Sequence, residues 1–188
     1  MKCIYGFCNL TVSFFEVNEE HAIVPFECGI GDLKQLFSYF LYRAPNIDSL
    51  QSPYLPPDFH DDILEQMLKG NEDYHFCEQN SNTEDELCRV SLNGSQVCVR
   101  CKRFMCKKMN KPSKRDDKRR ETNLECLLRH LRNSIAHGHV YVNYSGHYTS
   151  VLLEDENEKH HITARIVCCQ ADLKKWRTIL EKSIKDHS

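Results

Sequence analysis

The chain is organised around the stretch Leu124–Tyr141, which reads LECLLRHLRNSIAHGHVY. Gly138 follows its last apolar turn, and glycine readily adopts the left-handed backbone that ends a helix. The apolar residues before Gly138 recur at intervals of three and four, the spacing of one buried helical face; they are Leu124, Leu127, Leu128, Leu131 and Ile135. We therefore predict a buried helix that opens at Glu121 or Thr122 and ends at His137.

Polar side chains lie on another face of this predicted helix. Arg129, Asn133 and His137 are each four residues from the next, so they share one side. Arg132 lies at the edge of the apolar stripe, about one turn before His137, and its long side chain can reach the same space. The sequence thus predicts an arginine, an amide and a histidine beside the C-terminal end of a buried helix.

The six residues Arg132–His137, RNSIAH, resemble the R-x4-6-H motif of HEPN domains (higher eukaryote and prokaryote nucleotide-binding). HEPN domains are helical bundles, commonly dimeric, and many are metal-independent ribonucleases. The resemblance therefore implies RNA as substrate, a homodimer, no cofactor, and catalytic roles for Arg132, Asn133 and His137. It also implies a substrate-binding role for Arg129 beside them.

A second histidine also fits the family's motif. His139-Val140-Tyr141 resembles the H-x-Y ending of toxin members of the family, with six residues between Arg132 and His139. The catalytic histidine is thus His137 or His139, and we favour His137 because Gly138 ends the predicted helix there. His139 and Tyr141 are then expected to contact the substrate.

RNA cleavage without a metal needs a base for the ribose 2′-hydroxyl, an acid for the leaving 5′-oxygen and a cation beside the phosphate. Histidine suits the first two roles because its ordinary pKa is about 6.5. Arginine suits the third because its planar fork binds two phosphate oxygens. One chain supplies few such groups, and a symmetric dimer would double them.

Alternatives stay open at this point. The leading interpretation is an endoribonuclease, a toxin or phage-defence effector that would meet an antitoxin partner. The second is a catalytically inactive HEPN-like module that binds RNA or scaffolds other proteins. The third is that Arg132 and His137 only cap the helix, since helix C-termini often carry such cations.

A basic segment precedes the motif helix. Residues 100–120 hold eleven Lys or Arg and two acidic residues, whereas the whole chain has a net charge of −2. Such a block suits a phosphate backbone, and an exposed flexible linker is the alternative. The expected RNA contacts in this segment are Lys114, Arg115, Lys118 and Arg119.

Eleven cysteines raise the question of disulfides or a metal. We find no signal peptide, and the adjacent Cys168-Cys169 favours reduced thiols, so a cytoplasmic location is the expectation. Cys98 and Cys101 have zinc-ligand spacing, and Cys88 and Cys106 could complete the four ligands. The same run also fits a helix from about Gln96. We favour the helix, and we predict no metal site.

The remaining elements complete one expected domain over residues 1–188. Helices are predicted from Asp32 to about Arg43, from Asp58 or Asp61 to Gly70, and over Ala171–Ile184. Apolar and polar residues alternate over residues 139–168. This pattern predicts a hairpin, an acidic turn at Glu154–Glu158 and a third strand. Residues 1–28 look strand-like. The predicted fold is mainly α, a HEPN-like helical bundle with a small antiparallel β-sheet appended after the motif helix.

Overall fold

The computed structural model describes the greater part of the chain. The described residues are 14–16, 22–27, 29, 31–46, 49, 52–70, 73–77, 92, 96–98, 103–108, 120–145 and 148–187.

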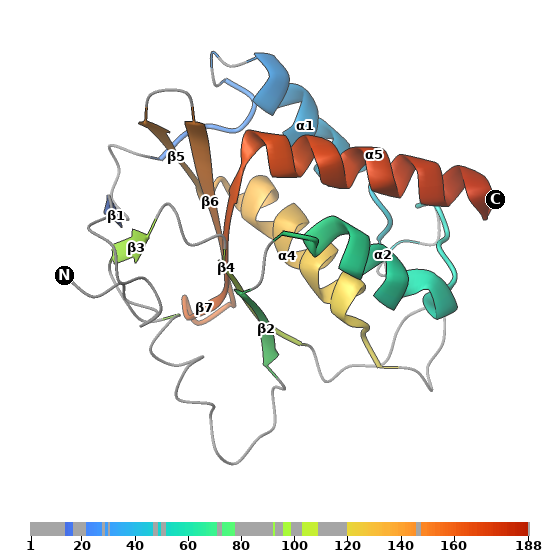
Figure 1. Ribbon diagram of the computed structural model, residues 1–188. Coiled ribbons are helices and arrows are strands. Elements are labelled where there is room, and N and C mark those ends of the chain that lie inside the picture. Colours follow the sequence, from blue (N-terminus) through green and yellow to red (C-terminus); the bar gives the residue numbers. More distant parts are fainter. Residues whose placement is uncertain are drawn as a thin grey trace.

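A mixed sheet forms one layer of the described structure (Figure 1). Its strand order is β2-β4-β7-β6-β5, with β2 parallel to β4 and the other pairs antiparallel. The strands are β2 (Asp73–Cys77), β4 (Arg103–Lys107), β5 (Val140–Ser145), β6 (Tyr148–Glu156) and β7 (Ile162–Cys169). A separate pair joins β1 (Phe14–Glu16) and β3 (Gln96–Cys98).

Helices cover one face of this sheet (Figure 1). They are α1 (Gly31–Tyr42), α2 (His60–Leu68, preceded by the 3₁₀ turn Pro57–Phe59), α4 (Asn123–His137) and α5 (Gln170–Asp186). Helix α4 packs on β6 and lies between α1 and α2. The sheet residues that face the helices alternate along each strand, as the period of two requires. On β6 they include Val151 and Leu153, which are fully buried.

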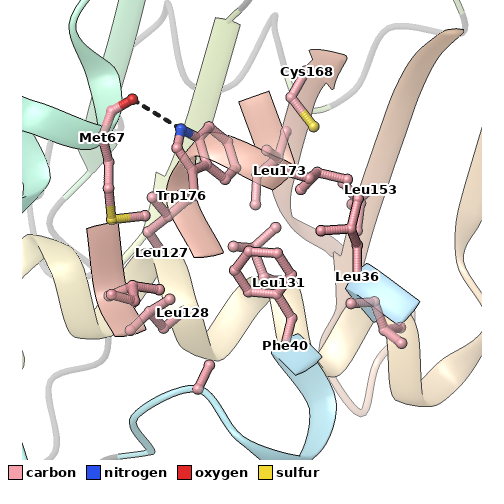
Figure 2. Close-up of a cluster of buried hydrophobic side chains, with 14 of the residues drawn as sticks. Leu36, Phe40, Met67, Leu127, Leu128, Leu131, Leu153, Cys168, Leu173 and Trp176 are labelled. Carbon is pink, nitrogen blue, oxygen red and sulfur yellow. Dashed lines mark hydrogen bonds between the residues drawn. The ribbon is translucent and has the colours of Figure 1, made fainter. Parts of the chain in front are cut away.

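The core fills the space between the helices and the sheet (Figure 2). Leu127 and Leu131 of α4 meet Phe40 of α1 and Trp176 of α5 in it. Trp176 is fully buried, and its indole N–H donates to the carbonyl oxygen of Met67 at 2.8 Å. That bond satisfies the one polar group of the indole and ties α5 to the end of α2.

Several predicted elements are confirmed. The helices expected at Asp32, before Gly70 and over Ala171–Ile184 correspond to α1, α2 and α5. The motif helix corresponds to α4, and the strands expected within 139–168 correspond to β5, β6 and β7, paired as predicted.

The predicted fold class is wrong. The fold is α+β rather than a mainly helical bundle, because β2 and β4 extend the sheet beyond the three strands that follow α4. The sheet is therefore mixed and not appended after the motif helix. Helices α4 and α5 pack on its central strands β4, β7 and β6.

The helix predicted from Gln96 is also wrong. Residues 96–98 and 103–107 are strands. Within β4, Cys106 enters the helix-side core while Met105 packs in a second cluster with Cys77, which is the alternation of a strand. Short apolar runs fit both periods, so pattern alone could not separate a helix from a strand here.

The acidic turn predicted at Glu154–Glu158 begins later in the structure than expected. Strand β6 continues to Glu156, and Glu154 and Asp155 are 3% and 2% exposed. Acidic side chains predict a turn because they usually face water. Here each meets a buried cation instead, as described below.

Candidate functional site

Helix α4 is fixed at both ends by its own sequence. Thr122 accepts from the backbone N–H of Glu125 at 3.2 Å, and the Glu125 carboxylate accepts from the backbone N–H of Thr122 at 2.8 Å. This capping box satisfies two backbone donors at the start of the helix. Gly138 ends it with φ 75°, as predicted. The polar residues of α4 therefore keep fixed positions along the helix.

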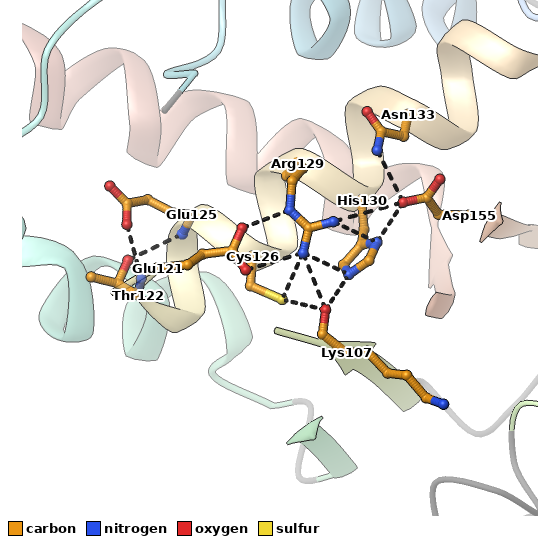
Figure 3. A network of polar contacts seen from close by, with 9 residues as sticks. All are labelled: Lys107, Glu121, Thr122, Glu125, Cys126, Arg129, His130, Asn133 and Asp155. Atoms are coloured by element: carbon orange, nitrogen blue, oxygen red, sulfur yellow. Dashed lines mark hydrogen bonds and ion pairs between the residues drawn. The ribbon is translucent and has the colours of Figure 1, made fainter. Parts of the chain in front are cut away.

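Arg129 is buried in an ion pair with Glu121 (Figure 3). Its Nε and Nη2 donate to the two carboxylate oxygens at 2.6 and 3.0 Å, and Nη2 also donates to the carbonyl oxygen of Lys107 at 3.1 Å. The bidentate geometry is the strongest form of this pair. Arg129 was expected to bind substrate, and the structure instead places it inside the fold, 7% exposed.

His130 extends the same buried network (Figure 3). Its Nδ1 lies 2.6 Å from Asp155 Oδ2 and its Nε2 lies 2.8 Å from the carbonyl oxygen of Lys107. Both of these partners are acceptors, so the two contacts favour an imidazolium, in which both ring nitrogens donate. Arg129 Nη2 also lies 3.1 Å from Nε2. Burial by itself lowers the pKa of His130, but the hydrogen bond to the Asp155 carboxylate and the interactions with Cys126 together outweigh it, and the pKa is raised to about 9.

Asn133 belongs to this network as well. Its Nδ2 donates to Asp155 Oδ2 at 3.1 Å, the oxygen that also binds His130 (Figure 3). The side-chain amide is thereby turned toward β6. Asp155 Oδ1 is buried and has no hydrogen-bond partner among the described residues.

Arg132 points to a different neighbour. Its Nη2 donates to the backbone carbonyl oxygens of Ala44 and Pro45, at 3.5 and 3.1 Å, in the loop after α1. The side chain is half-buried. Arg132 and Asn133 therefore lie on opposite flanks of α4, one toward the α1 loop and one toward the sheet.

His137 and His139 lie together at the C-terminal end of α4. Their ring centroids are 6.3 Å apart. His137 is exposed, whereas His139 is half-buried and its Nδ1 lies 3.9 Å from a carboxylate oxygen of Glu156. Glu156 also accepts from His160 at 3.1 Å. Two imidazoles and a carboxylate thus meet at the end of the motif helix.

Tyr141 lies on the sheet face that points away from α4. Its neighbours in β5, Val140 and Val142, enter the core, so Tyr141 projects oppositely. Burial raises the pKa of Tyr141, and the charges of Glu154 and Glu156 add to this. Glu154 is held at 2.5 Å by Nε of buried Arg165.

The comparison with known families assigns the chain to one of them. A model of the family described as HEPN pEK499 p136 matches residues 63–187, about two thirds of the chain. The chain belongs to this HEPN family. The matched region contains α4 and the polar side chains described above, whereas Ala44 and Pro45 precede it. No curated protein and no solved structure gives a significant match.

The HEPN motif residues are thus divided by the fold. Asn133 joins the buried network of the neighbouring Arg129, Arg132 faces the α1 loop, and His137 is exposed. Among the described residues of one chain, no hydrogen bond joins the side chains of Arg132 and His137.

Three network members were missed by the sequence interpretation: Glu121, His130 in a buried role, and Asp155. A signal existed for Asp155, since only Glu154, and no turn residue, separates it from the apolar run Val151–Leu153. An acid that continues a strand pattern indicates a buried partner. Glu121 gave no such signal, because it precedes the helix like an ordinary capping acid.

The predicted basic contacts Lys114, Arg115, Lys118 and Arg119 lie outside the described residues, as do Cys88 and Cys101. Four described cysteines are free thiols: Cys106, Cys126, Cys168 and Cys169. Cys77 is disulfide-bonded, so the expectation of reduced thiols fails there. No group of three or more potential metal ligands occurs within the described residues. None of the described helices has the length and apolar character needed to cross a membrane.

Proposed function

We propose that this HEPN protein is a metal-independent endoribonuclease that acts as a symmetric dimer. Arg132, Asn133 and His137 of two copies would form the cleaving site. The observation that carries the proposal is the exposed His137 at the end of a helix whose other motif residues are held rigidly. A toxin or phage-defence role, with an antitoxin partner in the cytoplasm, is part of the same proposal.

The reaction is a transesterification. The ribose 2′-oxygen attacks the phosphorus, its proton passes to one His137, and the bond from phosphorus to the 5′-oxygen breaks. The partner copy's equivalent histidine protonates the leaving 5′-oxygen. Arg132 stabilises the extra negative charge on the phosphoryl oxygens. The products carry a 2′,3′-cyclic phosphate and a 5′-hydroxyl.

Rigid support of the motif favours catalysis. The carbonyls of Ala44 and Pro45 orient the guanidinium of Arg132, and Asp155 orients the amide of Asn133. Groups held in advance at a reacting phosphate lose little entropy in the transition state.

The test is incubation of the purified protein with single-stranded and structured RNA in EDTA, followed by end-group analysis. His137→Ala should lower the cleavage rate by about a hundredfold or more. Arg132→Lys should be severely impaired, because a point charge does not reproduce the bidentate contact. His161→Ala, an exposed histidine in the turn after β6, is the matched control and should cleave normally.

His139→Ala decides between the two histidines. We expect a much smaller loss than for His137→Ala, because His139 is half-buried beside Glu156. A larger loss for His139→Ala would move the catalytic role to His139. Cleavage that persists in the His137 and Arg132 variants, or that stops in EDTA, would contradict the mechanism.

A second function is favoured by one observation. Arg132 already donates to two backbone carbonyls of its own chain, as a structural arginine would. An inactive HEPN module that binds RNA or scaffolds a partner would keep this contact. Wild-type protein that binds RNA without cleaving it would support this alternative.

A further inference from the structure

A cavity of about 590 Å³ lies along α1, where α5 packs beside it (Figure 1). We name it the α1 groove. Its described lining includes three cations, Lys34, Arg43 and Arg177, and no acidic side chain. Phe26 and Tyr39 add aromatic surface. No residue of α4 belongs to its described lining.

The cations of the α1 groove are only partly neutralised. Lys34 and Arg43 are exposed, and neither forms an ion pair with a described residue. Arg177 donates to Glu181 at 2.9 Å, and its guanidinium carbon lies 5.4 Å from the centre of the Tyr39 ring. Two positive charges without an ion-pair partner among the described residues therefore border the groove, which favours an anionic ligand.

The hydroxyl of Tyr39 is a buried donor without a partner. Tyr39 is 4% exposed, and its oxygen has no hydrogen bond among the described residues. Burial raises the pKa of Tyr39, so the hydroxyl keeps its proton. A buried hydroxyl without a hydrogen bond is unfavourable. Tyr39 lines the groove, so a ligand oxygen that reaches this hydroxyl would satisfy it.

Aromatic rings continue the groove at the end of α1. The rings of Phe26 and Tyr42 are 6.4 Å apart and tilted by 32°. Tyr42 is 73% exposed, which is unusual for a large aromatic side chain. An exposed ring beside a cationic groove is the arrangement that binds single-stranded nucleic acid, in which bases stack and phosphates meet cations.

The α1 groove leads toward the motif arginine. Arg43 directly precedes Ala44 and Pro45, whose carbonyls accept from Arg132. A strand bound along α1 would therefore arrive beside Arg132. A free anion would need only one cation and would leave the exposed Tyr42 without a role.

We propose that the α1 groove binds a single-stranded RNA segment and guides it to the site at Arg132. Lys34, Arg43 and Arg177 would contact successive phosphates, Tyr39 would donate to a phosphate oxygen, and Tyr42 would stack on a base. This proposal rests on the proposed ribonuclease function for its substrate, but it concerns binding and is measured apart from cleavage.

The test is fluorescence anisotropy with a labelled 12-nucleotide RNA in which every ribose is 2′-O-methylated, so that it cannot be cleaved. The double variant Lys34→Ala/Arg43→Ala should raise Kd about tenfold or more. The slope of log affinity against log salt should fall by about 1.4, since each phosphate contact on a single strand contributes about 0.7. Tyr42→Ala should weaken binding about fivefold or more and leave that slope unchanged.

Matched controls separate the groove from general charge. Lys159→Ala/Lys185→Ala removes the same charge in the β6–β7 turn and the last turn of α5, and it should leave Kd nearly unchanged. Tyr39→Phe deletes only the unpartnered hydroxyl, so it should weaken binding severalfold without lowering the midpoint of unfolding.

The outcomes distinguish this inference from the proposed function. Unchanged Kd in the groove variants, or wild-type protein that binds duplex but not single-stranded RNA, would overturn the groove proposal whatever the cleavage result. Binding of inorganic pyrophosphate without binding of the oligonucleotide would also overturn it. Loss of binding in the groove variants, with no cleavage by wild type, would support the groove and contradict the ribonuclease.

Discussion

His130 is fully buried and positively charged, because Asp155 and the Lys107 carbonyl both accept from its ring. Arg129 beside it is neutralised by Glu121. At the residue scale, therefore, two buried cations of α4 are each balanced by a buried acid, one before the helix and one on β6. Removing one member of such a pair leaves an uncompensated charge, which is far costlier than its replacement by an apolar pair.

We expect the stability of the protein to fall between about pH 6.5 and pH 9. The pKa of His130 is raised to about 9 in the folded state. Its stabilising contribution is thus full below the unfolded pKa, about 6.5, and is lost as the pH rises through 9. The contribution is about 3 kcal/mol at most, at about 1.4 kcal/mol per pKa unit.

The measurement is urea unfolding followed by the fluorescence of Trp176, the only tryptophan and a buried one. In His130→Gln the side chain at this position does not titrate. The free energy of unfolding should therefore change less with pH in that range, by the amount that the release of about one proton contributes. An identical dependence in His130→Gln would assign it to other groups.

The buried Arg129–Glu121 pair should matter far more than an exposed pair. Glu121→Ala leaves the Arg129 charge buried and should lower the free energy of unfolding by about 3–5 kcal/mol. Asp32→Ala breaks the exposed pair with Lys174 and should cost about 1 kcal/mol or less. Equal losses in the two variants, measured by urea unfolding, would show that Arg129 finds another partner.

At the element scale, α4 has start and stop signals of its own. The capping box at Thr122 and the left-handed Gly138 define the helix before any tertiary contact is considered. The strands show the contrast. β4 has no comparable local signal, and its neighbours β2 and β7 supply the hydrogen bonds that make it a strand.

Gly138→Ala should destabilise the protein by about 1–2 kcal/mol through its backbone alone. Gly138 has φ 75°, and a Cβ placed there meets no atom within 4 Å, so the cost is that of a left-handed residue. Gly29→Ala also adds a methyl group in open space, without a positive φ, and should be neutral or slightly stabilising. Thermal unfolding of the two variants checks this, and a neutral Gly138→Ala would contradict it.

At the scale of the whole molecule, the C-terminal turn of α4 presents a surface to the solvent. Ala136 and His137 are exposed, with Arg132 and Asn133 half-buried beside them. Ala136 has a small side chain, so two copies of α4 could approach closely there. A symmetric contact at Ala136 would bring two His137 side chains and two Arg132 side chains together. The proposed composite site requires such a contact.

Ala136→Glu should therefore abolish dimerisation and RNA cleavage together, because it places a bulky anion at the centre of the proposed contact. The monomer should stay folded, since position 136 is exposed. Analytical ultracentrifugation at micromolar concentration and the EDTA cleavage assay are the measurements. Thr178→Glu, exposed on α5, is the control and should dimerise normally. Wild-type protein that is only monomeric would contradict the dimer.

The sequence by itself determined α4, its two ends, the three strands after it and membership of the HEPN type. The helix and strands depend on the spacing of apolar residues, on helix caps and on a glycine at positive φ. These signals lie within short segments of sequence and do not need the rest of the fold. Tertiary structure alone decided the mixed sheet, the strand character of 103–107 and the burial of Arg129 and His130. Strand pairing and the partners of buried charges join residues far apart in the chain, and no local pattern specifies them.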